Sequence, residues 1–167
     1  MNGFREMRRS RQILSEDECI DILTTATSGT LAVLGDSDYP YAVPLSFVYS
    51  GGRIYFHSAT SGHKVDAVAT HDKASFCVIA QDNVCPQKFT TFFRSIIAFG
   101  KVSIVDDEVE RRDAIRLLGL KYSPGSEKEL EKEIESAFAR MIVIRLDIEH
   151  LTGKEAIELV RQRTGIS

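Results

Sequence analysis

The amino-acid sequence predicts a mainly β fold with α decoration (α+β), in which about six strands form an antiparallel barrel with flanking helices. Apolar runs rich in β-branched and aromatic residues recur between turn residues from Gly29 to Gly153. Two of these runs flank the pair Gly51-Gly52, which is a strong hairpin signal. Helix-like periodicity is confined to both ends of the chain, to a short stretch that ends at residue 71, and to an insertion at about 106–138.

The bulk composition is that of an ordinary globular protein. The 167 residues suffice for a hydrophobic core, and we expect a single domain over 1–167. With 43% hydrophobic residues, 27% charged residues and a net charge of −3, the chain has no general attraction for nucleic acid or an anionic membrane. No apolar run approaches the length of a membrane span, and no signal peptide is recognisable, so we expect a cytoplasmic protein.

Cysteine and histidine spacing predicts neither a disulfide framework nor a metal site. The three cysteines are an odd number without a CxxC pair, and the four histidines lack HExxH or other close ligand spacing. The sequence also lacks GxSxG, so a serine hydrolase has little support.

The first half of the chain is expected to begin with a helix and continue in strands. Ser15 opens the helix over 15–26, with Glu18 completing a capping box and Gly29 ending it. Pro44 lacks a backbone N–H, so its strand is expected at a sheet edge or with a bulge. The expected strands are 29–35, 41–50, 53–58 and 74–81, with a helix from about Ser61–His63 to 71 between the last two.

The second half begins with a long strand over 88–106, with a bend expected near Arg94-Ser95 or Gly100. The insertion is expected to form two helices, 106–120 with Asp106 or Asp107 as its cap, and 127–139. A last strand at 141–153 and a closing helix at 154–163 complete the order.

The stretch HSATSGHKVDAV, residues 57–68, has the order of an anion site: a strand end, a hydroxyl-rich turn, a helix start and Lys64. Free N–H groups at a helix start favour an anion, although the dipole alone contributes only about 0.3–1 kcal/mol. Lys64 would supply charge, hydroxyl groups would supply donors, and His63 would add one if protonated. An ordinary helix start explains the same residues. In the preceding strand, side chains alternate, so His57 and Ser58 face opposite sides.

Two further segments could border such a site. The run YPYAVPLSFVY is interrupted by proline, so part of its backbone stays free to contact the edge of a flat heterocycle. The run FFRSIIAFGKV places Arg94 and Ser95 beside Phe92 and Phe93, although these aromatic residues also suit a core.

The order of PYAVPLSFVY, IYFHSATSGHKVDAV, FRSIIAFGKV and HLTGKEA, after the opening MRRSRQILSEDECIDIL, resembles the pyridoxamine 5′-phosphate oxidase-like FMN-binding split-barrel superfamily. The chain looks most similar to the nitroimidazole-resistance (Nim-type) branch over roughly residues 7–155. The resemblance implies a six-stranded split β-barrel and a homodimer with FMN at the interface.

The resemblance also implies a role for individual residues. The strand along the isoalloxazine matches Tyr41, Ala42, Val43, Pro44 and Leu45. The strand end beside the ribityl chain and phosphate matches His57 and Ser58, and the phosphate-binding turn matches Gly62, His63 and Lys64. Ser95 matches a position near the flavin from the partner subunit.

The implied function is an FMN-dependent oxidoreductase that a nicotinamide or another donor reduces and that passes electrons to a nitroaromatic or quinone. Arg94 and His57 are candidate positive groups near the flavin, and no catalytic residue is assigned. The chain has no tryptophan and ends in IELVRQRTGIS, unlike true pyridoxamine-phosphate oxidases, so vitamin B6 oxidation is not expected. Three alternatives stay open: a non-catalytic flavin or haem binding protein, a deazaflavin-dependent reductase, and an interaction module without cofactor.

Overall fold

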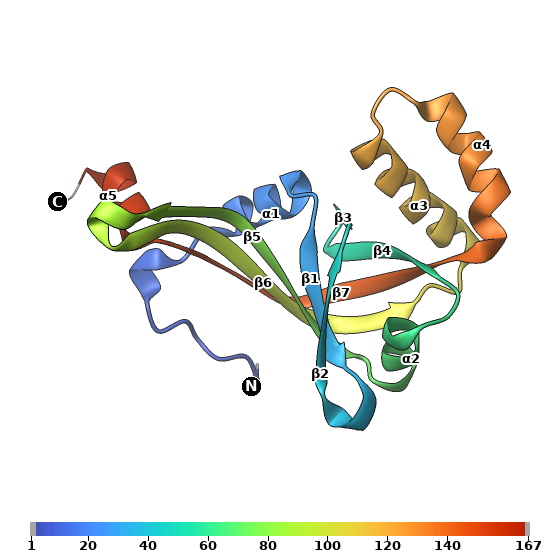
Figure 1. Cartoon of the computed structure of the whole chain (residues 1–167), viewed down its shortest axis with the longest axis horizontal. Coiled ribbons are helices and arrows are strands. Elements are labelled where there is room, and N and C mark those ends of the chain that lie inside the picture. Colours follow the sequence, from blue (N-terminus) through green and yellow to red (C-terminus); the bar gives the residue numbers. More distant parts are fainter. Residues whose placement is uncertain (1–2, 166–167) are drawn as a thin grey trace.

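The computed structural model describes residues 3–165, which form a seven-stranded antiparallel sheet and five α-helices (Figure 1). The strands are β1 (Gly29–Leu34), β2 (Pro40–Leu45), β3 (Val48–Ser50), β4 (Arg53–Ala59), β5 (Lys73–Cys85), β6 (Thr90–Ile104) and β7 (Met141–Glu155). The helices are α1 (Glu16–Thr25), α2 (His63–Thr70), α3 (Glu108–Tyr122), α4 (Glu127–Ala137) and α5 (Ile157–Thr164). No helix within residues 3–165 is long and apolar enough to cross a membrane.

The sheet curls into an open barrel because its two ends are joined by a very short connection. Its strand order is β2-β1-β5-β6-β7-β4-β3, so β2 and β3 are the end strands. Only Ser46 and Phe47 separate them in the chain, which limits the gap to roughly 10 Å. The two end strands are nevertheless not paired, which is the arrangement of a split barrel.

The expected strand count of six was wrong by one, because the run 41–50 is broken into β2 and β3. The break has a long-range cause. The backbone N–H of Phe47 donates to the Tyr122 hydroxyl at 2.9 Å instead of joining a strand ladder, and the Phe47 side chain is fully buried.

Pro44 lies on an edge strand, as predicted. The Gly35 N–H donates to the Tyr39 carbonyl at 2.8 Å where β1 turns into β2. Because antiparallel pairs alternate, Tyr41 and Val43 then bond toward β1, while Ala42 and Pro44 direct their backbone outward. The missing N–H of proline therefore falls on the free edge of β2.

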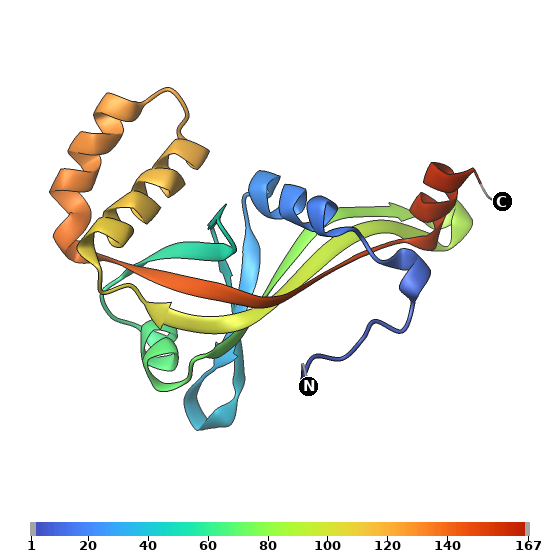
Figure 2. The same ribbon diagram turned by 180° about the vertical axis from the view of Figure 1, so that it is seen from behind.

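The strands β5 and β6 extend beyond the barrel as a long hairpin with α5 beside its tip (Figures 1 and 2). Strand β5 continues to Cys85, past the expected end at residue 81. The register shifts between Ile79 and Gln81, opposite Arg94 and Ser95, and again between Phe99 and Gly100 against β7. The ladder is therefore irregular at both positions considered for the bend in the long strand, but the extra residue lies in the partner strand each time, Ala80 in β5 and Glu149 in β7.

Two buried clusters hold the molecule together. The larger fills the barrel under α1 and α2 and includes Leu23, Phe47, Phe56 and Phe76. The smaller lies between the α3–α4 hairpin and the sheet and includes Leu118, Ile134 and Val143. The insertion at 106–138 therefore has a core of its own on one side of the barrel (Figure 1).

The helix boundaries confirm the predicted caps and correct two details. Ser15 and Glu18 form the capping box of α1, and Asp107 caps α3 by accepting from the Glu110 N–H at 2.7 Å. Gly29 does not end α1, which stops at Thr25. Gly29 is instead the first residue of β1, where the Phe76 ring leaves no room for a side chain. The last strand runs on to Glu155, so the closing helix begins at Ile157 rather than at residue 154.

Candidate functional site

The free edge of β2 supplies one side of the candidate site. Tyr41, Val43 and Leu45 are half-buried and pack against the barrel core, whereas Ala42 and Pro44 are exposed. The outward Ala42 N–H and C=O and the Pro44 C=O have no strand partner in the described part of the chain. A flat heterocycle with its own donors and acceptors matches such an edge.

The start of α2 supplies a second side. Gly62 is the N-cap with φ 128°, a conformation that favours glycine, and no side chain caps the helix. The N–H groups of the first turn are therefore open to a ligand. Lys64 is half-buried in this turn and forms no ion pair within residues 3–165.

Tyr41 and His63 connect these two sides. Their rings stack with 4.0 Å between centroids and 19° between planes. Nε2 of His63 lies 3.3 Å from the backbone nitrogen of Asp36 and 3.9 Å from its carboxylate. His63 thus stabilises the junction of β1, β2 and α2.

At the end of β4 the side chains alternate between the two faces of the strand, as its two-residue period predicts. Ser58 faces the barrel interior with Ile54 and Phe56, and its side chain is 4% exposed. Its hydroxyl has no hydrogen-bond partner among the described residues, which is costly for a buried polar atom and marks the place where a ligand oxygen or a water would fit. His57 faces outward and borders a cavity beneath the α3–α4 hairpin.

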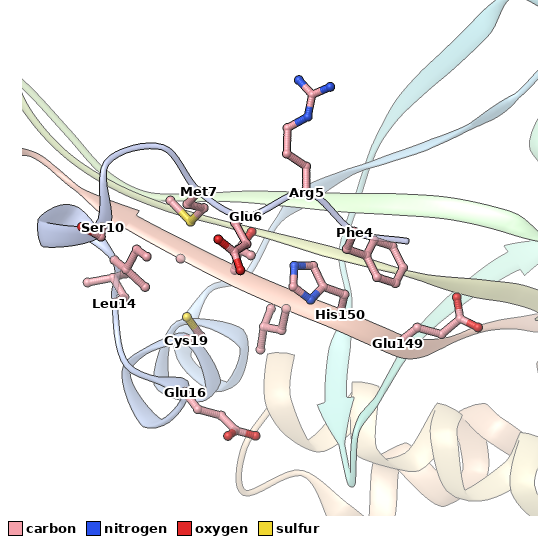
Figure 3. Close-up of a pocket in the computed structure, with 14 residues that line it drawn as sticks. Phe4, Arg5, Glu6, Met7, Ser10, Leu14, Glu16, Cys19, Glu149 and His150 are labelled. Carbon is pink, nitrogen blue, oxygen red and sulfur yellow. The ribbon is translucent and has the colours of Figure 1, made fainter. Parts of the chain in front are cut away.

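Ser95 does not join this cluster within one chain. It lies on β6 and lines a second cavity of about 550 Å³ together with Phe4 and Arg5 of the N-terminal segment and Lys154 of β7. An adjoining cavity of about 530 Å³ lies on the other side of the same segment. In Figure 3 the Phe4 ring lies beside His150, and the rings stack with 4.7 Å between centroids.

Arg94 is engaged in an ion pair rather than free beside the candidate site. Its guanidinium donates from Nη2 at 2.9 Å and from Nε at 3.1 Å to Glu155, whose side chain is fully buried. Arg163 donates to the other carboxylate oxygen at 2.7 Å. The Glu155 carboxylate is therefore satisfied by two cations, and the reading of Arg94 as a positive group near a cofactor loses support.

Sequence reasoning missed the residues that fix the α3–α4 hairpin to the barrel. Besides accepting from Phe47, the Tyr122 hydroxyl donates to the Thr27 carbonyl. The Lys121 ammonium lies 4.2 Å from the centre of the Phe47 ring, and burial lowers the pKa of Lys121. Lys121 and Tyr122 lie at the end of the helix expected from residue 106, and the sequence showed no further role for them because their partners lie far away in the chain.

Burial makes two of the three thiols less acidic. Burial raises the pKa of Cys19 to about 11 and also raises the pKa of Cys77. A thiol with a raised pKa is a poor nucleophile near neutral pH.

Comparison with known proteins relates this geometry to a family. The family model described as pyridoxamine 5′-phosphate oxidase matches residues 15–155. A candidate 5-nitroimidazole antibiotic resistance protein from Bacteroides thetaiotaomicron is similar in structure, with TM-score 0.69, 19% identity and 86% of each chain covered.

Two further similar structures are those of cofactor-binding proteins. The FAD and haem binding protein from Mycobacterium smegmatis has TM-score 0.74 and 24% identity, and the match covers 87% of this chain and 73% of that chain. An FAD-binding protein from Mesorhizobium loti has TM-score 0.59 and 25% identity over 87% of this chain and 97% of that chain.

Proposed function

The chain belongs to the pyridoxamine 5′-phosphate oxidase family, and on this premise we propose that it is a flavoprotein that binds FMN and reduces a small acceptor such as a nitroaromatic or a quinone. When bound, the flavin supplies the redox chemistry, accepting electrons from a donor such as a nicotinamide and passing them on. The protein's own residues bind and orient the cofactor.

The contact between Tyr41 and His63 is the observation that carries this proposal. It brings the free edge of β2 to the open first turn of α2, so that one ligand would reach both. A flavin mononucleotide has the two matching parts: a flat ring with polar edge atoms and a phosphate. Ala42 and Pro44 would contact the ring edge through their backbone, and Lys64 with the N–H groups near Gly62 would hold the phosphate.

The residues present fit such a ligand in a second respect. The Ser58 hydroxyl is buried and unpaired in the described chain, directly before the loop that leads to α2. A ribityl or phosphate oxygen, or a water bound to one, would satisfy it. The hydroxyl-rich residues Thr60 and Ser61 are exposed in the same loop.

We further propose that the flavin site is completed by a second copy of the chain. Ser95, Ile79 and Ile97 share one outward face of the β5–β6 hairpin, since register pairs Ile79 with Ser95 and Cys77 with Ile97. The Ile79 side chain is 68% exposed and that of Ile97 is 39% exposed, which is typical of an interface rather than a solvated face. A homodimer through this face would bring Ser95 of one subunit to the flavin of the other.

The first test is the absorbance spectrum of the purified protein, followed by release of any bound ligand and measurement of its mass. Flavin bands with the mass of FMN would support the proposal. The mass of FAD, a deazaflavin or haem would replace FMN as the proposed cofactor of the same fold. Turnover of a nitroaromatic or quinone with NADH or NADPH would separate a reductase from a non-catalytic carrier. A colourless protein that does not take up added FMN or FAD would refute flavin binding.

A further inference from the structure

The α3–α4 hairpin borders a half-open cavity that its own side chains do not fill. The cavity has a volume of about 250 Å³ and lies between the hairpin and the sheet. Its wall is mainly apolar, formed by Ile115, Leu118, Gly119, Leu130, Ile134 and Met141. An apolar cavity of about 150 Å³ is already enough to hold benzene, so this volume suffices for one small ring.

One end of the cavity is lined by residues of the segments that carry the proposed flavin site, although His57 faces away from Ser58. Ser46 follows directly after Leu45, and His57 directly precedes Ser58. Both side chains are exposed, and neither has a hydrogen-bond partner in the described chain. They are therefore free to donate to one polar group of a ligand whose apolar body lies under the hairpin.

The charge of the lining restricts the ligand class further. Glu133 is the one charged residue at the cavity, and the lining contains no lysine or arginine. An anion such as a nucleotide or a carboxylate would therefore be repelled and would lack a counterion. The cavity suits a small uncharged ring with a carbonyl or nitro group.

The hairpin is fixed rather than loosely attached. Tyr122 and Lys121 tie the end of α3 to Phe47, Thr27 and Leu23. A side chain at Gly119 would require Leu130 to move, so the two helices approach closely at the cavity. The size of the cavity is thus set by the sequence of the insertion.

We propose that this cavity binds the electron acceptor, and that the insertion selects small, planar, uncharged nitroaromatics or quinones. The proposal rests on the function proposed above and adds the location and the size limit of the acceptor. In this arrangement the acceptor enters beneath the hairpin and places its polar group at His57 and at Ser46, which directly follows the last residue of β2.

The experiment measures binding of para-fluoronitrobenzene to the full-length chain by fluorine NMR, with and without added FMN. Leu130→Phe and Met141→Phe fill the cavity and should each weaken binding about tenfold or more. Leu117→Phe is the matched control, because Leu117 is adjacent on α3, 39% exposed and outside the lining. Charged para-nitrobenzoate should bind about tenfold more weakly than the neutral probe.

Equal binding by the filled variants and the wild type would overturn the proposal, as would binding seen only in the presence of FMN. If the filled variants fail to fold, nuclear Overhauser contacts between the probe and the methyl groups of Leu118 and Ile134 in the wild type decide the question, and their absence refutes the proposal.

The flavin spectrum is recorded on the same samples. Probe binding without flavin uptake would refute only the proposed flavoprotein function, and flavin uptake without probe binding would refute only the acceptor cavity.

Discussion

The imidazole of His63 lies face to face with the ring of Tyr41, 4.0 Å away between centroids, and so connects the first residue of α2 to the edge strand β2. Such a pair contributes roughly 0.5–1.5 kcal/mol beyond the area that it buries. The stack fixes the position of His63 against Tyr41, and Lys64 is the next residue of the same helical turn. A ligand with a ring and a phosphate would find both parts of its site already formed.

Replacing Lys64 with alanine should weaken FMN binding without unfolding the protein. Alanine is a good helix former, and Lys64 has no ion pair within residues 3–165 to lose. A hydrogen bond to a charged group contributes roughly 1.5–3 kcal/mol, so the Kd for FMN should rise about 10- to 100-fold. Fluorescence titration measures it, and Lys73→Ala, an exposed lysine beyond the other end of α2, should leave the Kd unchanged.

Replacing Ile79 with lysine should convert a dimer into monomers and reduce flavin binding. The residue is 68% exposed in one chain, so the monomer fold tolerates the charge, whereas a buried interface does not. Light scattering coupled to size-exclusion chromatography measures the mass. Val109→Lys on α3 is the control, because Val109 is 70% exposed on a helix that packs against β3, β4 and β7 rather than on the β5–β6 hairpin. A wild-type protein that binds flavin as a monomer would contradict the proposed interface.

Replacing Arg94 with alanine should lower the free energy of unfolding by about 3 kcal/mol, because it leaves the fully buried Glu155 with only one cation. Arg161→Ala removes an exposed arginine of α5 without an ion pair in the described chain and should change little. Urea unfolding measures both. If Arg94 instead contacts the flavin, the variant would change FMN affinity or the flavin spectrum while its stability stays near that of the wild type.

The features that the sequence predicted depend on near neighbours. The capping box at Ser15, the hairpin at Gly51-Gly52 and the edge position of Pro44 each follow from a few adjacent residues. The opposite orientation of His57 and Ser58 follows from the two-residue period of a strand, although the sequence could not say which of them faces inward.

The features that were missed join residues far apart. Arg94 and Glu155 are 61 positions apart, and Phe47 and Tyr122 are 75 positions apart. No local pattern distinguishes Arg94 from a free surface cation, so its proximity to Ser95 suggested a cofactor contact. The break between β2 and β3 was missed for the same reason, since the Tyr122 hydroxyl that binds Phe47 belongs to a distant helix.

Replacing Tyr122 with phenylalanine should loosen the α3–α4 hairpin. The variant keeps the ring but removes the acceptor for the Phe47 N–H and the donor to Thr27. A buried N–H without a partner costs roughly 1–3 kcal/mol, so unfolding should require correspondingly less free energy. Hydrogen exchange should also become faster in α3 and α4 than in β5 and β6. Tyr39→Phe, at a ring that is 75% exposed, is the control and should leave exchange unchanged.

Glu110 should make the docking of α3 sensitive to acid. Its carboxylate accepts from the Tyr55 hydroxyl at 2.8 Å and from Nη1 of Arg145 at 3.0 Å. Burial alone would raise the pKa of Glu110, but these hydrogen bonds, together with the charges of Arg145 and Arg53, lower it below the usual 4.5.

A lowered pKa stabilises the fold fully above the unfolded-state pKa, and this stabilisation is lost as pH falls through the folded-state pKa. Urea unfolding between about pH 6 and pH 3 should therefore show a steeper decline for the wild type than for Glu110→Gln. Glu129→Gln, which removes an exposed carboxylate of α4, should retain the wild-type slope, and equal slopes for all three proteins would mean that Glu110 is not linked to folding.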